Sequence, residues 1–317
     1  MGMQKPPETK RYHALSDDLA DRYGKKTFKV ALDGGFTCPN RDGTKGVGGC
    51  AFCTLRGSGD FAGDRRLSLR DQFDAQLSIM KRKWPEGKYV VYFQAFTNTY
   101  ADSSLLKRLY ETAAGLHPDI VGLNVGTRPD CVPDDIVAVL KGLSSKTDVT
   151  VELGLQTIHP TTQKAMNLCY ATADFDDAVR RLHQAGLAVV AHVIDGLPGE
   201  TPAMMLDTIR HVARSGVAGV KLHMLHVMKG TALGLRYESD PFPLLTLPAY
   251  VSVVCDQLEL LPPDVVIHRL TGDAPAELLI APQWTRKKFV VQNEIDKELR
   301  RRDSRQGAKC ARTHDDL

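Results

Sequence analysis

The 317-residue sequence has no long hydrophobic run, no excess of one charge sign and no internal repeat. No segment reaches the roughly 18 uninterrupted apolar residues of a membrane-spanning helix, which excludes a helical membrane protein. The first ten residues, MGMQKPPETK, lack the apolar core of a secretory signal. We therefore expect a cytoplasmic protein without membrane contact.

The charge balance excludes further classes. Lys and Arg total 41 and Asp and Glu total 38, a net charge of +3, and 43% of the residues are hydrophobic. These values exclude a disordered chain, a collagen-like repeat and a coiled coil. The length suits one barrel-sized domain of about 200–250 residues with extensions, or two ordinary domains.

Seven cysteines are present, and they are unevenly spread. Cys38, Cys50 and Cys53 lie within sixteen residues, whereas the other four are scattered singly. Because a cytosolic protein seldom keeps disulfides, a tight group of cysteines indicates metal binding or redox chemistry. We interpret Cys169 and Cys255 as small core residues.

Short β-branched runs alternate with amphipathic stretches from Phe28 to Met224. The predicted strands are Lys29–Leu32, Tyr89–Phe93, Ile120–Val125, Val149–Leu155, Ala188–Ile194 and Val217–Met224. The predicted helices between them are Arg70–Arg82, Ser104–Gly115, Asp134–Leu143, Pro160–Leu168, Phe175–Ala185 and Pro202–Ser215. This alternation predicts right-handed crossovers and a parallel sheet.

The fold class that follows is α/β, an open, partial (β/α)6 TIM-type barrel, because the two further units of a closed barrel are not found. Residues 1–27 form an N-terminal extension, 28–236 the barrel core and 237–317 a C-terminal extension. In the last segment we expect a Pro-rich loop over 237–248, a helix over Ala249–Leu261 and a strand over Val265–Leu270.

The three clustered cysteines lie in the loop CPNRDGTKGVGGCAFC, soon after the first predicted strand. Loops beyond the carboxyl ends of parallel strands are where β/α folds build their sites. Thiolates favour zinc or iron–sulfur clusters. A structural zinc needs four ligands, whereas a cubane cluster held by three cysteines keeps one iron open for a small molecule. The loop favours the cluster, with a zinc site that has a distant fourth ligand as the alternative.

This loop resembles that of radical S-adenosylmethionine (SAM) enzymes, in the branch of the elongator catalytic subunit and oxygen-independent coproporphyrinogen oxidase. Within that branch it is similar to a small bacterial elongator-like family whose loop reads FTCPNRDG…GGCxFC. The long gap between Cys38 and Cys50 matches this branch rather than most radical SAM enzymes, and the similarity runs from about Tyr12 to Trp284. The resemblance implies a [4Fe-4S] cluster on Cys38, Cys50 and Cys53, with SAM on the open iron.

The resemblance also implies a set of SAM-contacting residues. Phe52 stands where the superfamily places an aromatic residue against the adenine. The other expected SAM contacts follow later predicted strands and are Gln94, Thr97, Asn98, Glu152, Gln156, Ile194, Gly196, Leu225 and Met228. For Glu152 taken alone, a charge paired inside the barrel is the alternative.

The activity implied by the resemblance is cleavage of SAM by one electron from an external donor. The resulting 5′-deoxyadenosyl radical abstracts hydrogen from the substrate. The elongator-like relatives act on the wobble uridine of tRNA, which favours tRNA modification. A tetrapyrrole or protein substrate remains an alternative, as does a zinc-binding RNA-binding module without catalysis.

Two further features bear on the substrate. The tail from Trp284 to Arg312 carries ten Lys or Arg against four Asp or Glu, which indicates either contact with tRNA phosphates or a salt-bridged terminal helix. A base splayed out of the RNA would enter the barrel mouth. The residues expected near it are Arg128, Lys221, His223, His268 and Arg269. The sequence predicts no oligomeric state.

Overall fold

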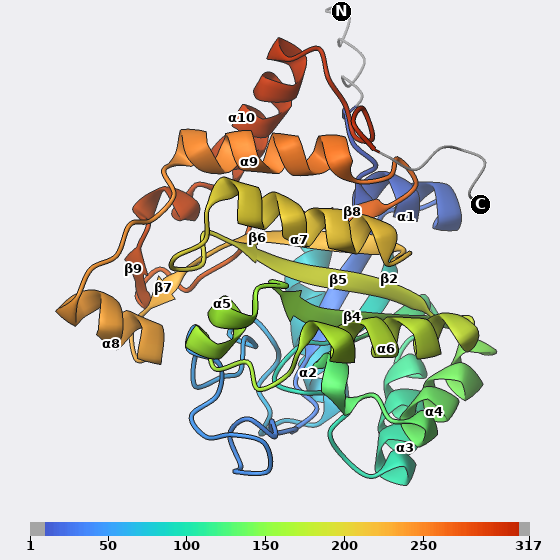
Figure 1. The fold of residues 1–317 in the computed structure, drawn as a ribbon. Helices are drawn as coiled ribbons and strands as arrows, with labels where there is room; N and C mark the ends of the chain where they lie inside the picture. Colours follow the sequence, from blue (N-terminus) through green and yellow to red (C-terminus); the bar gives the residue numbers. More distant parts are fainter. Residues whose placement is uncertain (1–9, 311–317) are drawn as a thin grey trace, which may run out of the picture.

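The computed structural model describes residues 10–310. Residues 1–9, where a secretory signal was sought, and Arg312 of the basic tail lie outside the described residues. Within them, seven parallel strands form one curled sheet in the order β1-β2-β3-β4-β5-β6-β8 (Figure 1). The sheet does not close on itself, because β1 and β8 are its two edges. The predicted partial barrel is confirmed.

The strands agree closely with the predicted runs. They are β1 (Thr27–Leu32), β2 (Lys88–Phe93), β3 (Ile120–Thr127), β4 (Asp148–Gln156), β5 (Ala188–Asp195), β6 (Gly219–Met224) and β8 (Val266–Arg269). The prediction of six units was one strand short. The strand expected within the C-terminal extension pairs in parallel with β6 and becomes the seventh strand of the sheet. The short strands β7 (Val227–Met228) and β9 (Leu279–Ala281) form a separate antiparallel pair.

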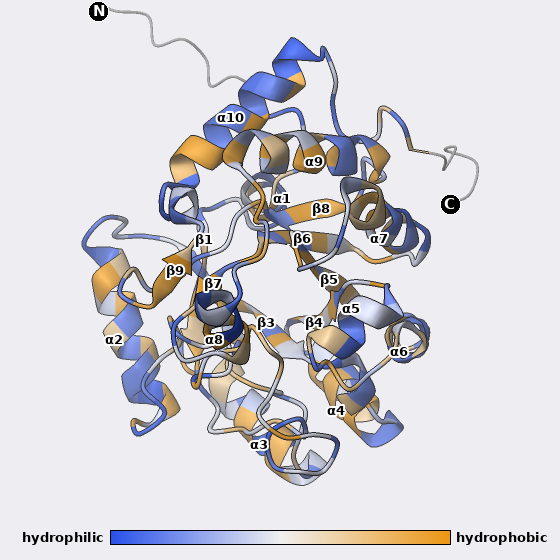
Figure 2. Ribbon diagram, turned by 60° about the vertical axis from the view of Figure 1, so that its left-hand side comes forward, coloured by the Kyte–Doolittle hydropathy of each residue, from blue (hydrophilic) through white to orange (hydrophobic). Residues whose placement is uncertain are grey.

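Helices cover the outer face of the sheet (Figures 1 and 2). Those of the barrel are α2 (Leu69–Lys81), α3 (Ser103–Ala114), α4 (Asp134–Ser144), α5 (Pro160–Ala165), α6 (Thr172–Gln184) and α7 (Pro202–Arg214). The helix α5 ends three residues before its predicted end. Side-chain caps start several helices: the Asp102 carboxylate accepts from the Ser104 and Leu105 amides at α3, and the Thr201 hydroxyl accepts from the Met204 amide at α7.

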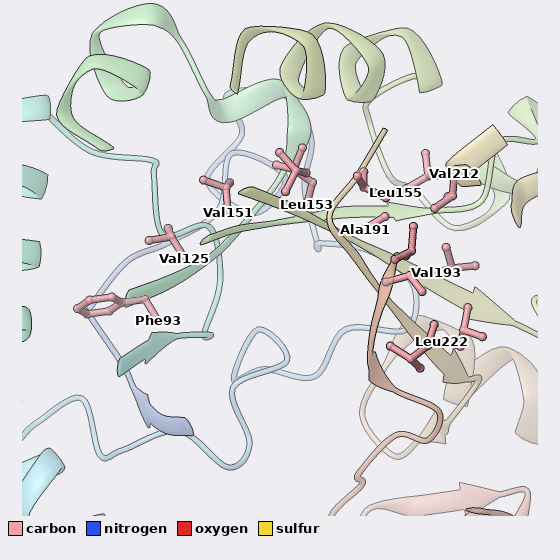
Figure 3. Close-up of a cluster of buried hydrophobic side chains, with 14 of the residues drawn as sticks. Phe93, Val125, Val151, Leu153, Leu155, Ala191, Val193, Val212 and Leu222 are labelled. Atoms are coloured by element: carbon pink, nitrogen blue, oxygen red, sulfur yellow. The ribbon is translucent and has the colours of Figure 1, made fainter. Parts of the chain in front are cut away.

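The hydrophobic core lies between the sheet and these helices. Figure 3 shows side chains such as Phe93, Val125, Val151 and Val193 pointing from successive strands into this layer. Since side chains alternate between the two faces of a strand, the residues between them face the inside of the curled sheet. These positions hold mostly polar side chains, and they position the site described below.

The remaining elements are α1 (Leu15–Tyr23), α8 (Ala232–Ser239), α9 (Leu247–Leu260) and α10 (Lys288–Arg301). Residues near both chain ends meet at the edge strand β8. The Ile267 amide donates to the His13 carbonyl, and the Gln306 side chain accepts from the His13 amide and donates to the carbonyls of Pro262 and Val265. None of the helices formed by residues 10–310 has both the length and the apolar character needed to cross a membrane.

Candidate active site

The cysteine loop follows β1 and is fastened to distant parts of the chain. The Ala51 amide donates to the Met166 carbonyl at 2.9 Å, and the Leu233 amide donates to the Ala51 carbonyl at 2.8 Å. Gly49 adopts φ +80°, in the left-handed region that favours glycine, immediately before Cys50. These contacts hold the loop above the carboxyl ends of the strands.

The three cysteines share one environment. Cys38 is buried, Cys50 and Cys53 are half-buried, and all three thiols are free. Burial, together with the neighbouring Cys53 and Cys38, raises the pKa of Cys50 to about 12, while Arg128 opposes this shift. All three cysteines line one cavity, and three soft ligands suit an iron–sulfur cluster. No group of three His, Cys, Asp or Glu side chains in the described part of the chain is arranged to hold a single metal ion.

A cavity of about 500 Å³ opens beside this loop, lined by residues of the cysteine loop and of the strands of the curled sheet. It brings together sixteen of the eighteen residues expected at the site. They are Cys38, Cys50, Phe52, Cys53, Gln94, Thr97, Arg128, Glu152, Gln156, Ile194, Lys221, His223, Leu225, Met228, His268 and Arg269.

Asn98 and Gly196 do not line the cavity. Asn98 is fully buried, and its side-chain amide donates to the carbonyls of Phe93 and Gly126. It therefore braces the turn after β2. Gly196 has φ +86° after β5, and a Cβ there would meet the Leu245 side chain at 3.2 Å. Both positions shape the backbone rather than face the cavity.

The other residues after β2 connect this strand to the cysteine loop. The Gln94 side chain donates to the Ser58 carbonyl at 3.0 Å, and the Thr97 amide donates to the Thr37 carbonyl at 3.2 Å. Phe96 lies between them with φ +63°. Its ring is covered by the guanidinium of Arg41 at 5.5 Å. These contacts attach the segment after β2 to the cysteine loop.

One side of the cavity is largely apolar. Phe52 and Ile194 pack against a small cluster of buried residues that includes Leu225. Gln156, at the end of β4, has φ +66° and lies over Gly154, where a Cβ would meet its Nε2 at 2.6 Å. An apolar surface of this kind suits the flat face of a purine base.

Glu152 stands at the centre of the polar side of the cavity. Its Oε1 accepts from Lys29 Nζ at 2.8 Å and Asn124 Nδ2 at 2.7 Å. Its Oε2 is bonded by Lys221 and by His192, the latter at 2.9 Å. Both oxygens are engaged, so Glu152 is a charge paired within the barrel. A direct contact with SAM would require it to release one of these partners.

This network sets the charge states of its members. Burial favours the neutral acid, yet Lys221 and Lys29 hold the pKa of Glu152 well below its usual value, so it is ionised. Burial lowers the pKa of Lys221 and of His192, the latter to about 4, while Glu152 acts in the opposite direction on both. The imidazole of His192 is therefore neutral at physiological pH.

Arg128 is held by the protein itself. Its guanidinium forms two 2.9 Å bonds to the Asp130 carboxylate, donates to the carbonyls of Leu168 and Cys169, and lies 4.9 Å from the Tyr170 ring centroid. With only 7% of its surface exposed, it fastens the segment after α5 beside the cysteines. Cys169 is exposed rather than a core residue, whereas Cys255 is buried as predicted.

Among the cavity residues that were missed in the sequence, four matter for the polar side of the cavity. They are Lys29, Tyr92, His192 and His226. The first three are single polar or amphipathic side chains within apolar strand runs, at positions that face the barrel interior. A search for one such residue in each strand would have found them.

The basic tail is largely ion-paired. In α10, Lys297 pairs with Glu294 at 2.7 Å and Arg301 pairs with Glu298 at 2.7 Å. Arg302 reaches Asp256 of α9 at 2.6 Å. Much of the tail's positive charge is thus compensated, as in the salt-bridged helix given as the alternative.

Known proteins share both the sequence pattern and the fold. Residues 38–212 match the radical SAM superfamily, and residues 217–301 match the radical SAM C-terminal domain. The protein YtqA of Bacillus subtilis is 47% identical over 298 residues, which cover 94% of this chain and 92% of YtqA. The tRNA uridine(34) acetyltransferase of Dehalococcoides mccartyi is 31% identical over 51% of this chain and 35% of that protein. The solved structure of Elp3 from Methanocaldococcus infernus has a TM-score of 0.65 at 19% identity, over 88% of this chain and 64% of that one.

Proposed function

Because the chain belongs to the radical SAM superfamily, we propose that it modifies the wobble uridine of tRNA with a [4Fe-4S] cluster and SAM. The observation that carries the cofactor assignment is the cavity that unites Cys38, Cys50 and Cys53 with the strand ends. When bound, the cluster and SAM supply a 5′-deoxyadenosyl radical that abstracts hydrogen from an unreactive carbon.

The residues of this chain have distinct roles in the proposal. The three cysteines hold the cluster, and Phe52, Ile194 and Leu225 provide the apolar surface for the adenine. Asn98 keeps the turn after β2 in place without lining the cavity, whereas Arg128 lines the cavity and its guanidinium holds the segment after α5. The proposed reaction requires that bulk water be kept away from the reactive radical, which limits side reactions.

The assignment to tRNA is supported by similarity to the tRNA uridine(34) acetyltransferases, one of which aligns over half of this chain. The exposed basic residues of the tail offer a secondary contact for RNA phosphates. The proposed reaction also requires an external electron donor, which reduces the cluster.

Nucleoside mass spectrometry of tRNA from strains with and without the gene tests the substrate. We expect one wobble-uridine derivative to disappear in the deletion strain and a precursor to accumulate. Unchanged wobble nucleosides would instead direct the search to a non-RNA substrate.

The cofactor assignment has its own test. Anaerobically reconstituted protein with SAM and dithionite should release 5′-deoxyadenosine, and its iron and sulfide should match one [4Fe-4S] cluster per chain. Zinc without iron in the purified protein would favour the RNA-binding module.

A further inference from the structure

The cavity wall formed by β1, β6 and β8 carries more positive than negative charge. Lys29, Lys221 and Arg269 face the cavity against two carboxylates, Glu152 and Asp273. Each carboxylate already has two cationic partners: Glu152 binds both lysines, and Asp273 binds Arg269 at 2.7 Å and the more exposed Lys288 at 3.0 Å. Burial lowers the pKa of Lys221 to about 7, so the excess of positive charge over the two carboxylates rests on Lys29, Arg269 and Lys288.

Three histidines add donors on the same wall. His223, His226 and His268 all line the cavity. The rings of His223 and His226 form no hydrogen bond within residues 10–310, and Nδ1 of His268 lies 3.4 Å from Lys29 Nζ. Gly272 leaves room for His226, because a Cβ there would meet its ring at 2.3 Å.

The charge states of these rings follow from the same surroundings. Burial lowers the pKa of all three, that of His226 to about 4 although Asp273 acts in the opposite direction, and nearby Arg269 also acts to lower the pKa of His223 and His226. Each ring is therefore neutral at physiological pH and presents one N–H group.

We propose that this wall binds a negatively charged oxygen group of the substrate, a carboxylate or a phosphate, between Arg269 and the three histidines. The residues of this wall belong to β1, β6, β8 and the segments that follow β6 and β8, whereas the cysteines lie in the loop after β1. The proposal deepens the proposed function and rests on it for the identity of the substrate as RNA.

An anion suits this wall better than a neutral or cationic group. A cation would meet Lys29, Lys221 and Arg269, while both oxygens of Glu152 are already engaged. An oxyanion would accept charge-assisted hydrogen bonds from Arg269 and neutral ones from the imidazoles. Such bonds are stronger in a buried cavity than in water.

Calorimetry tests the anion site without turnover. Inorganic phosphate and acetate are titrated into reconstituted enzyme saturated with SAM, in the absence of reductant. We expect saturable binding of at least one anion, weakened about tenfold or more by Arg269→Gln and by His223→Gln, since a hydrogen bond to a charged group contributes at this level. Thermal melting checks that both variants fold.

The matched control is Arg210→Gln, which also removes one ion-paired arginine. Arg210 pairs with Asp207 on the outer helix α7, away from the cavity. It should leave anion binding unchanged. Absence of saturable binding of either anion to the wild type would overturn the proposal, as would equal losses in the Arg269 and Arg210 variants.

Anticodon stem-loop RNAs identify the source of the anion. Three stem-loop RNAs are compared, which differ only at C5 of the wobble uridine. The first carries hydrogen there, the second an acetic acid group and the third the neutral methyl ester of that acid. If the acid binds more tightly than the ester and Arg269→Gln removes the difference, the anion is a carboxylate of the base. If all three bind equally and the variant weakens all three alike, it is a phosphate. If Arg269→Gln weakens none, the wall does not bind the substrate.

The two proposals can fail separately. Binding of phosphate or acetate without binding of any stem-loop would refute the tRNA assignment and leave the oxyanion site standing. Conversely, suppose that the stem-loops bind equally well to the wild type, Arg269→Gln and His223→Gln while neither anion binds. That result would refute the oxyanion site and leave the tRNA assignment standing.

Discussion

The carboxylate of Glu152 connects side chains from four other strands. Lys29 of β1, Asn124 of β3, His192 of β5 and Lys221 of β6 all converge on it from around the curled sheet. Removing one member of a buried charged network leaves the others uncompensated, which costs more than the pair itself contributes. Glu152 is therefore a residue on which both the shape of the cavity and the stability of the barrel depend.

Glu152→Gln should lower the free energy of unfolding by about 3–5 kcal/mol, because Lys29 and Lys221 would face each other without a counter-charge. Urea unfolding measures the loss. The double variant Glu152→Gln/Lys221→Met should recover part of it. Asp207→Asn, which breaks an exposed pair with Arg210, should cost less than about 1 kcal/mol. Equal losses in the Glu152 and Asp207 variants would contradict this role.

Cys50→Ala should abolish the brown colour of the reconstituted protein and reduce formation of 5′-deoxyadenosine at least about 100-fold, because two thiolates cannot hold a three-cysteine cluster. Cys310→Ala, which removes a free thiol outside the cavity, should retain both properties. Iron content and visible absorption measure the outcome. An intact cluster in the Cys50 variant would remove Cys50 from the ligand set.

At the scale of elements, one buried contact joins the end of β5 to α9. The Gln257 amide donates to Asp195 Oδ1 at 2.6 Å, while Asp195 Oδ2 and Gln257 Oε1 have no partner in the described structure. Burial raises the pKa of Asp195 to about 7. A protonated Asp195 would be able to donate to the amide oxygen, which would satisfy both groups.

The contact makes stability depend on pH. The pKa of Asp195 is about 7 in the folded chain and 3.8 as an ordinary aspartate, so the folded state binds its proton more tightly. The stability contributed by Asp195 is therefore fully present below about pH 4 and decreases as pH rises toward 7, by up to about 1.4 kcal/mol per pH unit. Asp195→Asn should remove this contribution, so that the slope of stability against pH in urea unfolding between pH 5 and pH 7 becomes more positive than in the wild type, whereas Asp207→Asn should keep the wild-type slope. A slope unchanged in the Asp195 variant would refute the assignment.

The elements show what local patterns predict. The strand runs were located to within about two residues, because their apolar side chains and the caps at the helix starts are local signals. The place of the strand over Val266–Arg269 was not predicted, because pairing with β6 is a long-range property. Likewise, no pattern near Asn98, Arg128 or Glu152 reveals the distant groups that they bind.

The sequence predicted which residues gather at the candidate site better than it predicted the role of each residue there. Strand-end residues converged in one cavity because the carboxyl ends of parallel strands lie at one rim. The ion pairs of the basic tail were not predictable in the same way, since Asp256 lies 46 residues from Arg302. Partners so far apart meet only through the packing of α9 against α10.

At the scale of the whole molecule, Gln306 fastens both ends of the described chain to the edge of the sheet. Its side chain forms hydrogen bonds with His13, Pro262 and Val265 at 2.6–2.9 Å and is 6% exposed. A smaller side chain at this position would leave the His13 amide and the carbonyls of Pro262 and Val265 without these hydrogen bonds, and each loss would cost about 1 kcal/mol or more.

Gln306→Ala should therefore lower the free energy of unfolding by about 2–4 kcal/mol and speed hydrogen exchange of the Ile267 amide on β8. Urea unfolding and hydrogen exchange measure the two effects. The exposed Gln184→Ala should change neither. Fast exchange throughout the sheet, rather than at β8, would contradict a local role for Gln306.

The position of β8 at the free edge has a consequence for synthesis on the ribosome. The cysteine loop precedes β8 and the Gln306 fastening by about 210 residues or more in the chain. A nascent chain thus presents its three thiols long before the wall bearing Arg269 exists. We expect that iron and sulfide can reach the thiols during this interval without crossing that wall, and that the interior becomes selective for its ligands once β8 has joined the sheet.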